Sequence, residues 1–129
     1  MTGSVRLWLH AEGLAVLLAA VLLFHLQGYS WLLFGILFLA PDASFAGYLA
    51  GSRTGAVVYN ALHSYVGPLL LTAGLLLSGR PVAVALIWVA HIGMDRMLGY
   101  GLKYPTAFRD THLGLIGRND SVHGARQAP

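Results

Sequence analysis

Three acidic residues of this sequence lie inside long apolar stretches, where acidic side chains are uncommon. Glu12, Asp42 and Asp95 interrupt runs of aliphatic and aromatic residues, in a chain that is 57% hydrophobic and 10% charged. A carboxylate inside a membrane segment costs about 2.5–3.5 kcal/mol, so it usually has a partner and a function. His63 and His91 lie in stretches of the same kind. These five residues are the first candidates for chemistry.

Carboxylates combined with imidazoles indicate a particular kind of metal site. Nitrogen ligands favour zinc, iron or manganese over magnesium or calcium, so we expect a divalent transition metal. The expected ligands are Asp42, His63, His91 and Asp95. The chain has no cysteine, which excludes thiolate ligands. Glu12 is expected to act as a ligand or general base, and Arg96 is a candidate partner for an oxyanion or a phosphate.

Helical spacing supports this grouping in two apolar segments. His91 and Asp95 are four residues apart, so they share one face of a helix and could bind one ion or each other. His63 is preceded at three and four residues by Asn60 and Tyr59, which extend a polar stripe on that helix. We count both as possible additional members of the site.

Four apolar segments are long enough to carry these residues across a membrane. A bilayer core of about 30 Å needs about 20 helical residues, and the mean hydropathy of the chain is +0.66. The predicted helices cover approximately residues 7–27, 29–50, 56–77 and 81–100. Their connections are short, so consecutive helices should be antiparallel neighbours. We therefore predict an all-α fold, a membrane-embedded antiparallel four-helix bundle that forms one domain over residues 1–117.

The basic residues predict how this bundle is oriented. Only Arg80 lies on one side of the predicted bundle. The other side carries Arg6, Arg53, Lys103, Arg109, Arg118 and Arg126, with Arg96 close to it. The positive-inside rule then places both termini in the cytoplasm. The net charge of +3 is thus a signal of topology, and the expected partner is the lipid bilayer, not nucleic acid.

The five candidate residues are predicted to lie at nearly one depth in this bundle. Counted from the cytoplasmic helix ends, their depths are about 8–14 Å at about 1.5 Å per residue. Pro41 directly precedes Asp42, and it should kink the second helix and free a carbonyl group. Each of the four helices thus contributes to one polar layer in the cytoplasmic half.

The C-terminal part is predicted to leave the membrane. Residues 101–117 are too short and too polar to span, and we expect them to lie at the cytoplasmic surface or to fold back as a lid. Asp110 and His112 could then face the polar layer, although contact with lipid headgroups is an alternative. Residues 118–129 are expected to form a disordered tail.

Several short motifs of the chain resemble one known family. They are LWLHAEG from Leu7, APD from Ala40, YNALH from Tyr59, HIGMDR from His91, GYGLKYP from Gly99 and FRDTHLG from Phe108. Together they resemble a small bacterial integral membrane family, domain of unknown function 4260, over about residues 6–117. The resemblance implies a bacterial integral membrane protein of this size, and we expect a multi-pass protein of the inner membrane. It implies no activity.

The polar layer is consistent with several functions. The leading hypothesis is a metal-dependent, hydrolase-like membrane enzyme acting on a lipid or another hydrophobic substrate, in which the metal activates a water molecule. The same ligands could hold iron for redox chemistry. A second hypothesis is a proton or metal-ion pathway, but only His25 stands out near the outer side, and a pathway needs polar residues there too.

Non-catalytic interpretations also remain open at this stage. In an assembly or binding subunit, the polar layer would be an internal structural contact, with a hydrogen bond between His91 and Asp95 and a salt bridge from Glu12 to a nearby arginine. Haem between His63 and His91 is a minor alternative, because carboxylates suit haem poorly. The substrate and the oligomeric state are left open.

Overall fold

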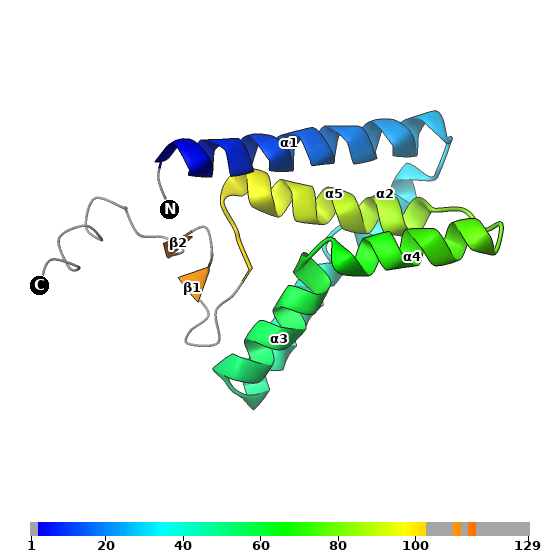
Figure 1. Ribbon diagram of the computed structural model, residues 1–129. Helices are drawn as coiled ribbons and strands as arrows, with labels where there is room; N and C mark the ends of the chain where they lie inside the picture. The colour runs from blue at the N-terminus through cyan, green and yellow to red at the C-terminus, as the bar shows by residue number, and fades with distance from the viewer. Residues whose placement is uncertain (1–2, 103–109, 112–113, 116–129) are drawn as a thin grey trace, which may run out of the picture.

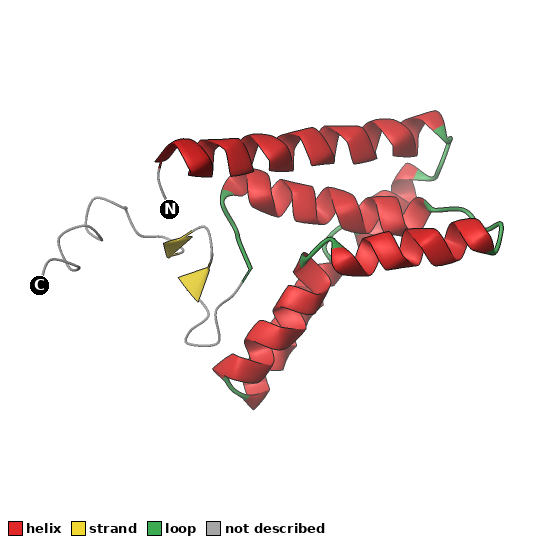
Figure 2. Cartoon of the chain, viewed as in Figure 1, coloured by secondary structure: helices red, strands yellow, loops and turns green. Residues whose placement is uncertain are grey.

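The computed structural model describes residues 3–102, 110–111 and 114–115, and nearly all of this part is helical (Figures 1 and 2). The helices are α1 (Gly3–Leu26), α2 (Trp31–Leu37), the 3-10 helix η1 (Ala40–Ala50), α3 (Ser52–His63), α4 (Val66–Leu77) and α5 (Ala83–Leu98). Two short strands, β1 (Asp110–Thr111) and β2 (Gly114–Leu115), pair in antiparallel fashion.

The second predicted segment changes helix type and the third is broken in two, each near a proline. In the second, α2 gives way to η1, which has Pro41 in its first turn. In the third, α3 and α4 meet at a bend of 43°. Pro68 explains this bend, because it has no N–H for the carbonyl of Ser64 and its ring would clash with that group in a continuous helix. The sequence predicted the kink at Pro41 but not the break before Pro68.

The helices pack mainly as two pairs. α1 lies along α5, and η1 lies along α3 in a second pair that projects away from the other helices (Figure 1). Two glycines allow α1 and α5 to approach closely. A Cβ atom added to Gly93 would lie 2.8 Å from the backbone nitrogen of Leu17 and 2.9 Å from the carbonyl oxygen of Gly13. This contact fixes the position of α5, the helix that carries two of the candidate ligands.

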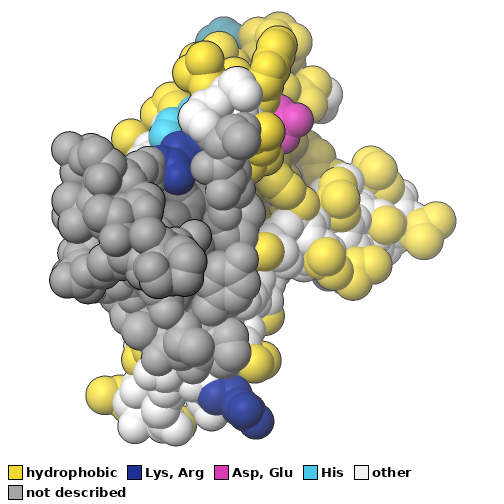
Figure 3. Space-filling view, turned by 60° about the vertical axis from the view of Figure 1, so that its left-hand side comes forward, with side chains coloured by type: hydrophobic (Ala, Val, Ile, Leu, Met, Phe, Trp, Pro, Cys, Tyr) yellow, Lys and Arg dark blue, Asp and Glu magenta, His cyan; other side chains and the backbone are white. Residues whose placement is uncertain are grey.

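The surface of the described part is strongly apolar. Large hydrophobic side chains are exposed along α1, α2 and α4, and they dominate the described surface in the view of Figure 3. Within the described residues, two helical segments are long and apolar enough to cross a membrane, Gly3–Leu26 and Trp31–Ala50. A third is obtained if the bent pair of α3 and α4 counts as one span.

These observations confirm the helical class and correct the details of the architecture. Four membrane-length helices were expected, whereas α5 has only 16 residues and does not reach the length of a span. The antiparallel four-helix bundle is not confirmed, because a bend divides the third segment and α5 is short. The predicted lid and tail lie outside the described residues, apart from the β1–β2 pair.

Candidate metal centre

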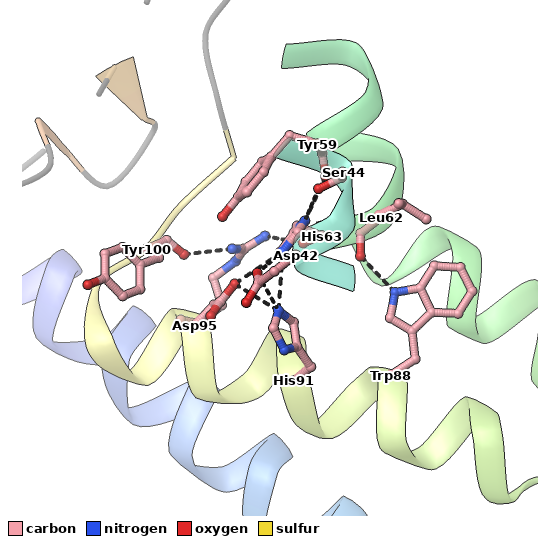
Figure 4. A network of polar contacts seen from close by, with 10 residues as sticks. Asp42, Ser44, Tyr59, Leu62, His63, Trp88, His91, Asp95 and Tyr100 are labelled. Carbon is pink, nitrogen blue, oxygen red and sulfur yellow. Dashed lines mark hydrogen bonds and ion pairs between the residues drawn. The ribbon is translucent and has the colours of Figure 1, made fainter. Parts of the chain in front are cut away.

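The structure brings four of the predicted site residues together at the junction of the two helix pairs (Figure 4). Each residue offers one candidate ligand atom, and these atoms all lie within 4.8 Å of one another. The four residues, which we call the Asp–His cluster, are Asp42, His63, His91 and Asp95. η1 supplies the first, the last residue of α3 the second, and one face of α5 the other two.

The distances within the Asp–His cluster are short and nearly equal. Asp42 Oδ1 lies 3.2 Å from the Nε2 atoms of both His63 and His91. Asp95 Oδ2 lies 3.5 Å from His63 Nε2 and 3.4 Å from His91 Nε2. The two Nε2 atoms are themselves 3.2 Å apart. Five of the six distances between these four atoms therefore lie between 3.2 and 3.5 Å.

The hydrogen bonds of His63 indicate which of its nitrogens faces the cluster without a proton. Its Nδ1 lies 2.9 Å from the carbonyl oxygen of Tyr59, and a carbonyl can only accept, so Nδ1 carries the hydrogen. In the neutral ring, Nε2 then carries no hydrogen and offers a lone pair. The ring of Tyr59 also stacks on His63, with centroids 3.8 Å apart, and Ser44 Oγ lies 3.5 Å from Nδ1. These contacts orient Nε2 of His63 toward both carboxylates.

The cluster contains more acceptors than hydrogens. When both carboxylates are ionised and His63 Nε2 has no proton, only Nε2 of His91 could offer a hydrogen to the centre. A cation bound among the four atoms would accept a lone pair from each of them, because metal ligands bind in their deprotonated form. In a tetrahedral site with metal–ligand bonds of 2.0–2.1 Å, the ligand atoms are about 3.3–3.4 Å apart. Five of the six distances in the cluster lie close to this value.

Burial differs among the four side chains. The side chains of His63 and His91 are fully buried, and that of Asp95 is 8% exposed. That of Asp42 is 35% exposed and forms the open side of the cluster. The short gap between the two imidazoles leaves no room for a porphyrin, so this geometry does not fit haem.

Arg96 lies beside the cluster and connects three backbone segments. Its Nη2 donates to the carbonyl of His63 at 2.7 Å, and its Nη1 donates to the carbonyl of Tyr100 at 2.7 Å. The break between α3 and α4 leaves the carbonyl of His63 without a helical partner, and Arg96 supplies the missing donor. Sequence reasoning placed Arg96 near the site but did not anticipate this role.

Glu12 and Asn60, two of the remaining candidates, are not members of the Asp–His cluster. Glu12 is exposed on α1 and lines a separate cavity of about 350 Å³ together with Arg96 and Tyr65. Asn60 is half-buried on α3, one turn before His63. His112 lies outside the described residues, and for Asp110 the structure describes only the backbone of β1.

The fold and the cluster together define a class of protein. It is a helical protein with apolar segments of membrane length and a buried group of carboxylates and imidazoles that could hold a metal ion. The chain belongs to the family described as "Domain of unknown function (DUF4260)", which matches residues 6–116 and confirms the resemblance seen in the motifs. Comparison with curated proteins and with solved structures found no match.

Proposed function

We propose that this protein is a metal-dependent hydrolase of the bacterial inner membrane, with a divalent transition metal in the Asp–His cluster. The observation that carries the proposal is the set of five contacts of 3.2–3.5 Å between four lone-pair atoms. Zinc suits this arrangement best, because it accepts tetrahedral nitrogen and oxygen ligands. Iron and manganese share the ligand preference but favour additional ligands.

Differential burial suggests a division of roles among the ligands. Two histidines and one carboxylate form the zinc site of several hydrolases, with water in the fourth position. His63, His91 and Asp95 are the buried set of this kind. Asp42, on the open side, would then exchange with water or act as the general base. This arrangement leaves a position where a substrate can reach the metal.

The proposed reaction is the hydrolysis of an ester of a hydrophobic substrate. A metal held by His63, His91 and Asp95 would lower the pKa of a water molecule toward about 7. Asp42 would accept a proton from this water as the water adds to the carbonyl carbon. The bond from that carbon to the alcohol oxygen breaks, and the proton passes from Asp42 to the leaving alcohol. Water and ester are consumed, and an acid and an alcohol are formed. Arg96 and Glu12 are proposed to assist from the neighbouring cavity.

A metal-ion pathway is a second candidate, favoured by a specific observation. Transporters often build ion sites from broken membrane helices whose ends meet at the ion. Here His63 precedes the break between α3 and α4, and Asp42 lies in the first turn of η1, where α2 changes to a 3-10 helix. A structural metal that only holds the two helix pairs together is a third candidate, because four protein ligands are typical of structural zinc sites.

Metal analysis of the purified protein in detergent tests the metal site. Elemental mass spectrometry should find about one equivalent of metal, as expected for one four-ligand site. The variant His63→Gln should lose most of this metal. His25→Gln is the matched control, since His25 is exposed on α1 outside the cluster, and it should bind metal normally. Full metal content in His63→Gln would refute the assignment.

Activity then separates the three candidates. A hydrolase should cleave a long-chain 4-nitrophenyl ester when loaded with zinc and should lose this activity after chelation and in Asp42→Asn. A pathway should instead release zinc from loaded proteoliposomes. Tightly bound metal that supports neither hydrolysis nor zinc release would indicate that the metal has a structural role.

A further inference from the structure

An apolar cavity of about 210 Å³ lies one helical turn from the Asp–His cluster. Its walls include Pro41 and Leu62, the residues directly before Asp42 and His63 in the sequence. Two ligands of the proposed metal therefore directly follow cavity-lining residues in the sequence. It is a different space from the one that Glu12 lines.

Helix α5 connects the same cavity to the other two ligands. Ile87 and Trp88 line it, and they precede His91 on α5 by four and three residues. Residues at these spacings are neighbours on a helix surface. Figure 4 shows Trp88 and Leu62 beside each other, next to the cluster. Three of the four ligands thus lie within four residues of the cavity lining, and Asp95 lies one turn beyond His91 on α5.

The cavity offers no free polar group to a ligand. Its lining side chains are aliphatic apart from Trp88, whose indole N–H donates to the carbonyl of Leu62 at 2.7 Å. The indole ring also abuts Gly67 of α4, since a Cβ atom added there would lie 2.7 Å from the ring atom Cζ2. Trp88 is therefore held in place as a fixed apolar wall, and the occupant must itself be apolar.

The size of the cavity suggests the kind of apolar group. An apolar protein cavity of about 150 Å³ stays dry and binds benzene. A cavity of about 210 Å³ is therefore large enough for a hydrocarbon segment longer than a six-carbon ring. Two of its lining residues, Ala40 and Val84, are exposed on the apolar surface, so a chain dissolved in the bilayer can enter from the side.

We propose that this cavity binds the hydrocarbon chain of an amphiphilic substrate and places the chain's polar end at the Asp–His cluster. The substrate class is then an acyl or prenyl amphiphile with an oxygen-containing headgroup next to the chain. This inference rests on the proposed function for the reacting end. Occupation of the cavity by a chain can be measured without any metal.

Quenching of Trp88 fluorescence by 1-bromooctane tests the inference. The background variant carries Trp8→Phe and Trp31→Phe, so that Trp88 is the only tryptophan. Metal-free protein in detergent should show quenching that saturates with bromooctane. Val84→Phe, which fills the cavity from its exposed rim, should weaken this binding at least tenfold. Ala19→Phe is the matched control, because Ala19 is exposed on α1 outside the cavity, and it should leave binding unchanged.

Competition with hydroxamic acids tests the link between the chain and the metal. Octanohydroxamic acid should displace bromooctane at least tenfold more strongly from the zinc-loaded protein than from the metal-free protein, because its headgroup chelates the metal. Acetohydroxamic acid, which has no long chain, should not displace it. Both results together would support the proposed substrate class.

Two outcomes would overturn the inference. Quenching that rises without saturation, or that is equal in Val84→Phe and Ala19→Phe, would mean that no chain occupies the cavity. Equal displacement with and without zinc would mean that the occupant does not reach the cluster. Metal content is measured separately on the same samples, so failure of the metal site is distinguished from failure of the chain site.

Discussion

The close contact between α1 and α5 predicts that the variant Gly13→Ala is less stable and binds metal poorly. The new Cβ atom would lie 2.7 Å from the carbonyl oxygen of Gly93 and even closer to the backbone nitrogen of Met97, whereas ordinary contacts begin at 3.4 Å. Backbone atoms cannot rotate away. To raise 2.7 Å to 3.4 Å, the two helices must separate by at least about 0.7 Å.

The expected cost follows from this displacement. Overpacking by one small group typically costs about 1–3 kcal/mol. Alanine in place of glycine also gains up to about 1 kcal/mol of helix propensity. The same displacement would move His91 and Asp95, which are carried by α5. Metal–ligand distances tolerate changes of only about 0.2 Å, so zinc affinity should fall at least tenfold.

Gly74→Ala is the matched control for this variant. Gly74 lies in α4, and an added Cβ atom there would meet nothing within 4 Å. It should therefore gain helix propensity without the steric overlap. Denaturation followed by circular dichroism should show a free energy of unfolding about 1–3 kcal/mol lower for Gly13→Ala than for Gly74→Ala. Chelator competition measures the zinc affinity. Equal stability and equal affinity in the two variants would refute the reasoning.

Three further predictions test the site and the topology. Arg96→Lys should lower the free energy of unfolding by about 1–3 kcal/mol, because one ammonium cannot replace the guanidinium at the carbonyls of both His63 and Tyr100; unchanged denaturation would contradict this. Zinc at a thousandfold excess over its Kd should stabilise the protein by about 4 kcal/mol, and chelation should reverse the shift in melting temperature. Single cysteines at Ser78 and Ser121 should react with impermeant reagents from opposite sides of the membrane, and labelling from the same side would disprove the predicted orientation.

Much of the fold could be predicted from the sequence because apolar periodicity and length are local signals. The first predicted helix agrees with α1 to within a few residues. The second segment corresponds to Trp31–Ala50, with a change of helix type within it, whereas the third is broken between α3 and α4. A signal for the bend was present, since Pro68 cannot accommodate the carbonyl of Ser64 in a continuous helix. The direction in which α3 then leaves the other helices depends on its packing against η1, which no local pattern specifies.

The grouping of the cluster residues could be predicted because buried acids are costly and depth along a helix can be counted. The same count placed Glu12 in the polar layer, but the structure has it exposed on α1. Depth alone does not specify the direction in which a side chain points. The stacking of Tyr59 on His63 agrees with their spacing of four residues on α3. The hydrogen bond from Trp88 to Leu62 depends on tertiary packing that depth and spacing do not reveal.

The helix changes beside Asp42 and His63 and the Asp–His cluster are structurally linked. The change from α2 to η1 lies close to Asp42, and α3 ends at His63. Both ligands can therefore contact α5. The contact between the two helix pairs is otherwise sparse, so the cluster is a principal connection between them. A cation in the cluster would bind only when both pairs are in place, and by linkage it would favour that arrangement. Metal binding would therefore be coupled to the shape of the adjacent apolar cavity. Pro41 and Leu62 line one wall and Ile87 and Trp88 the other, and they belong to the two pairs that the cluster joins.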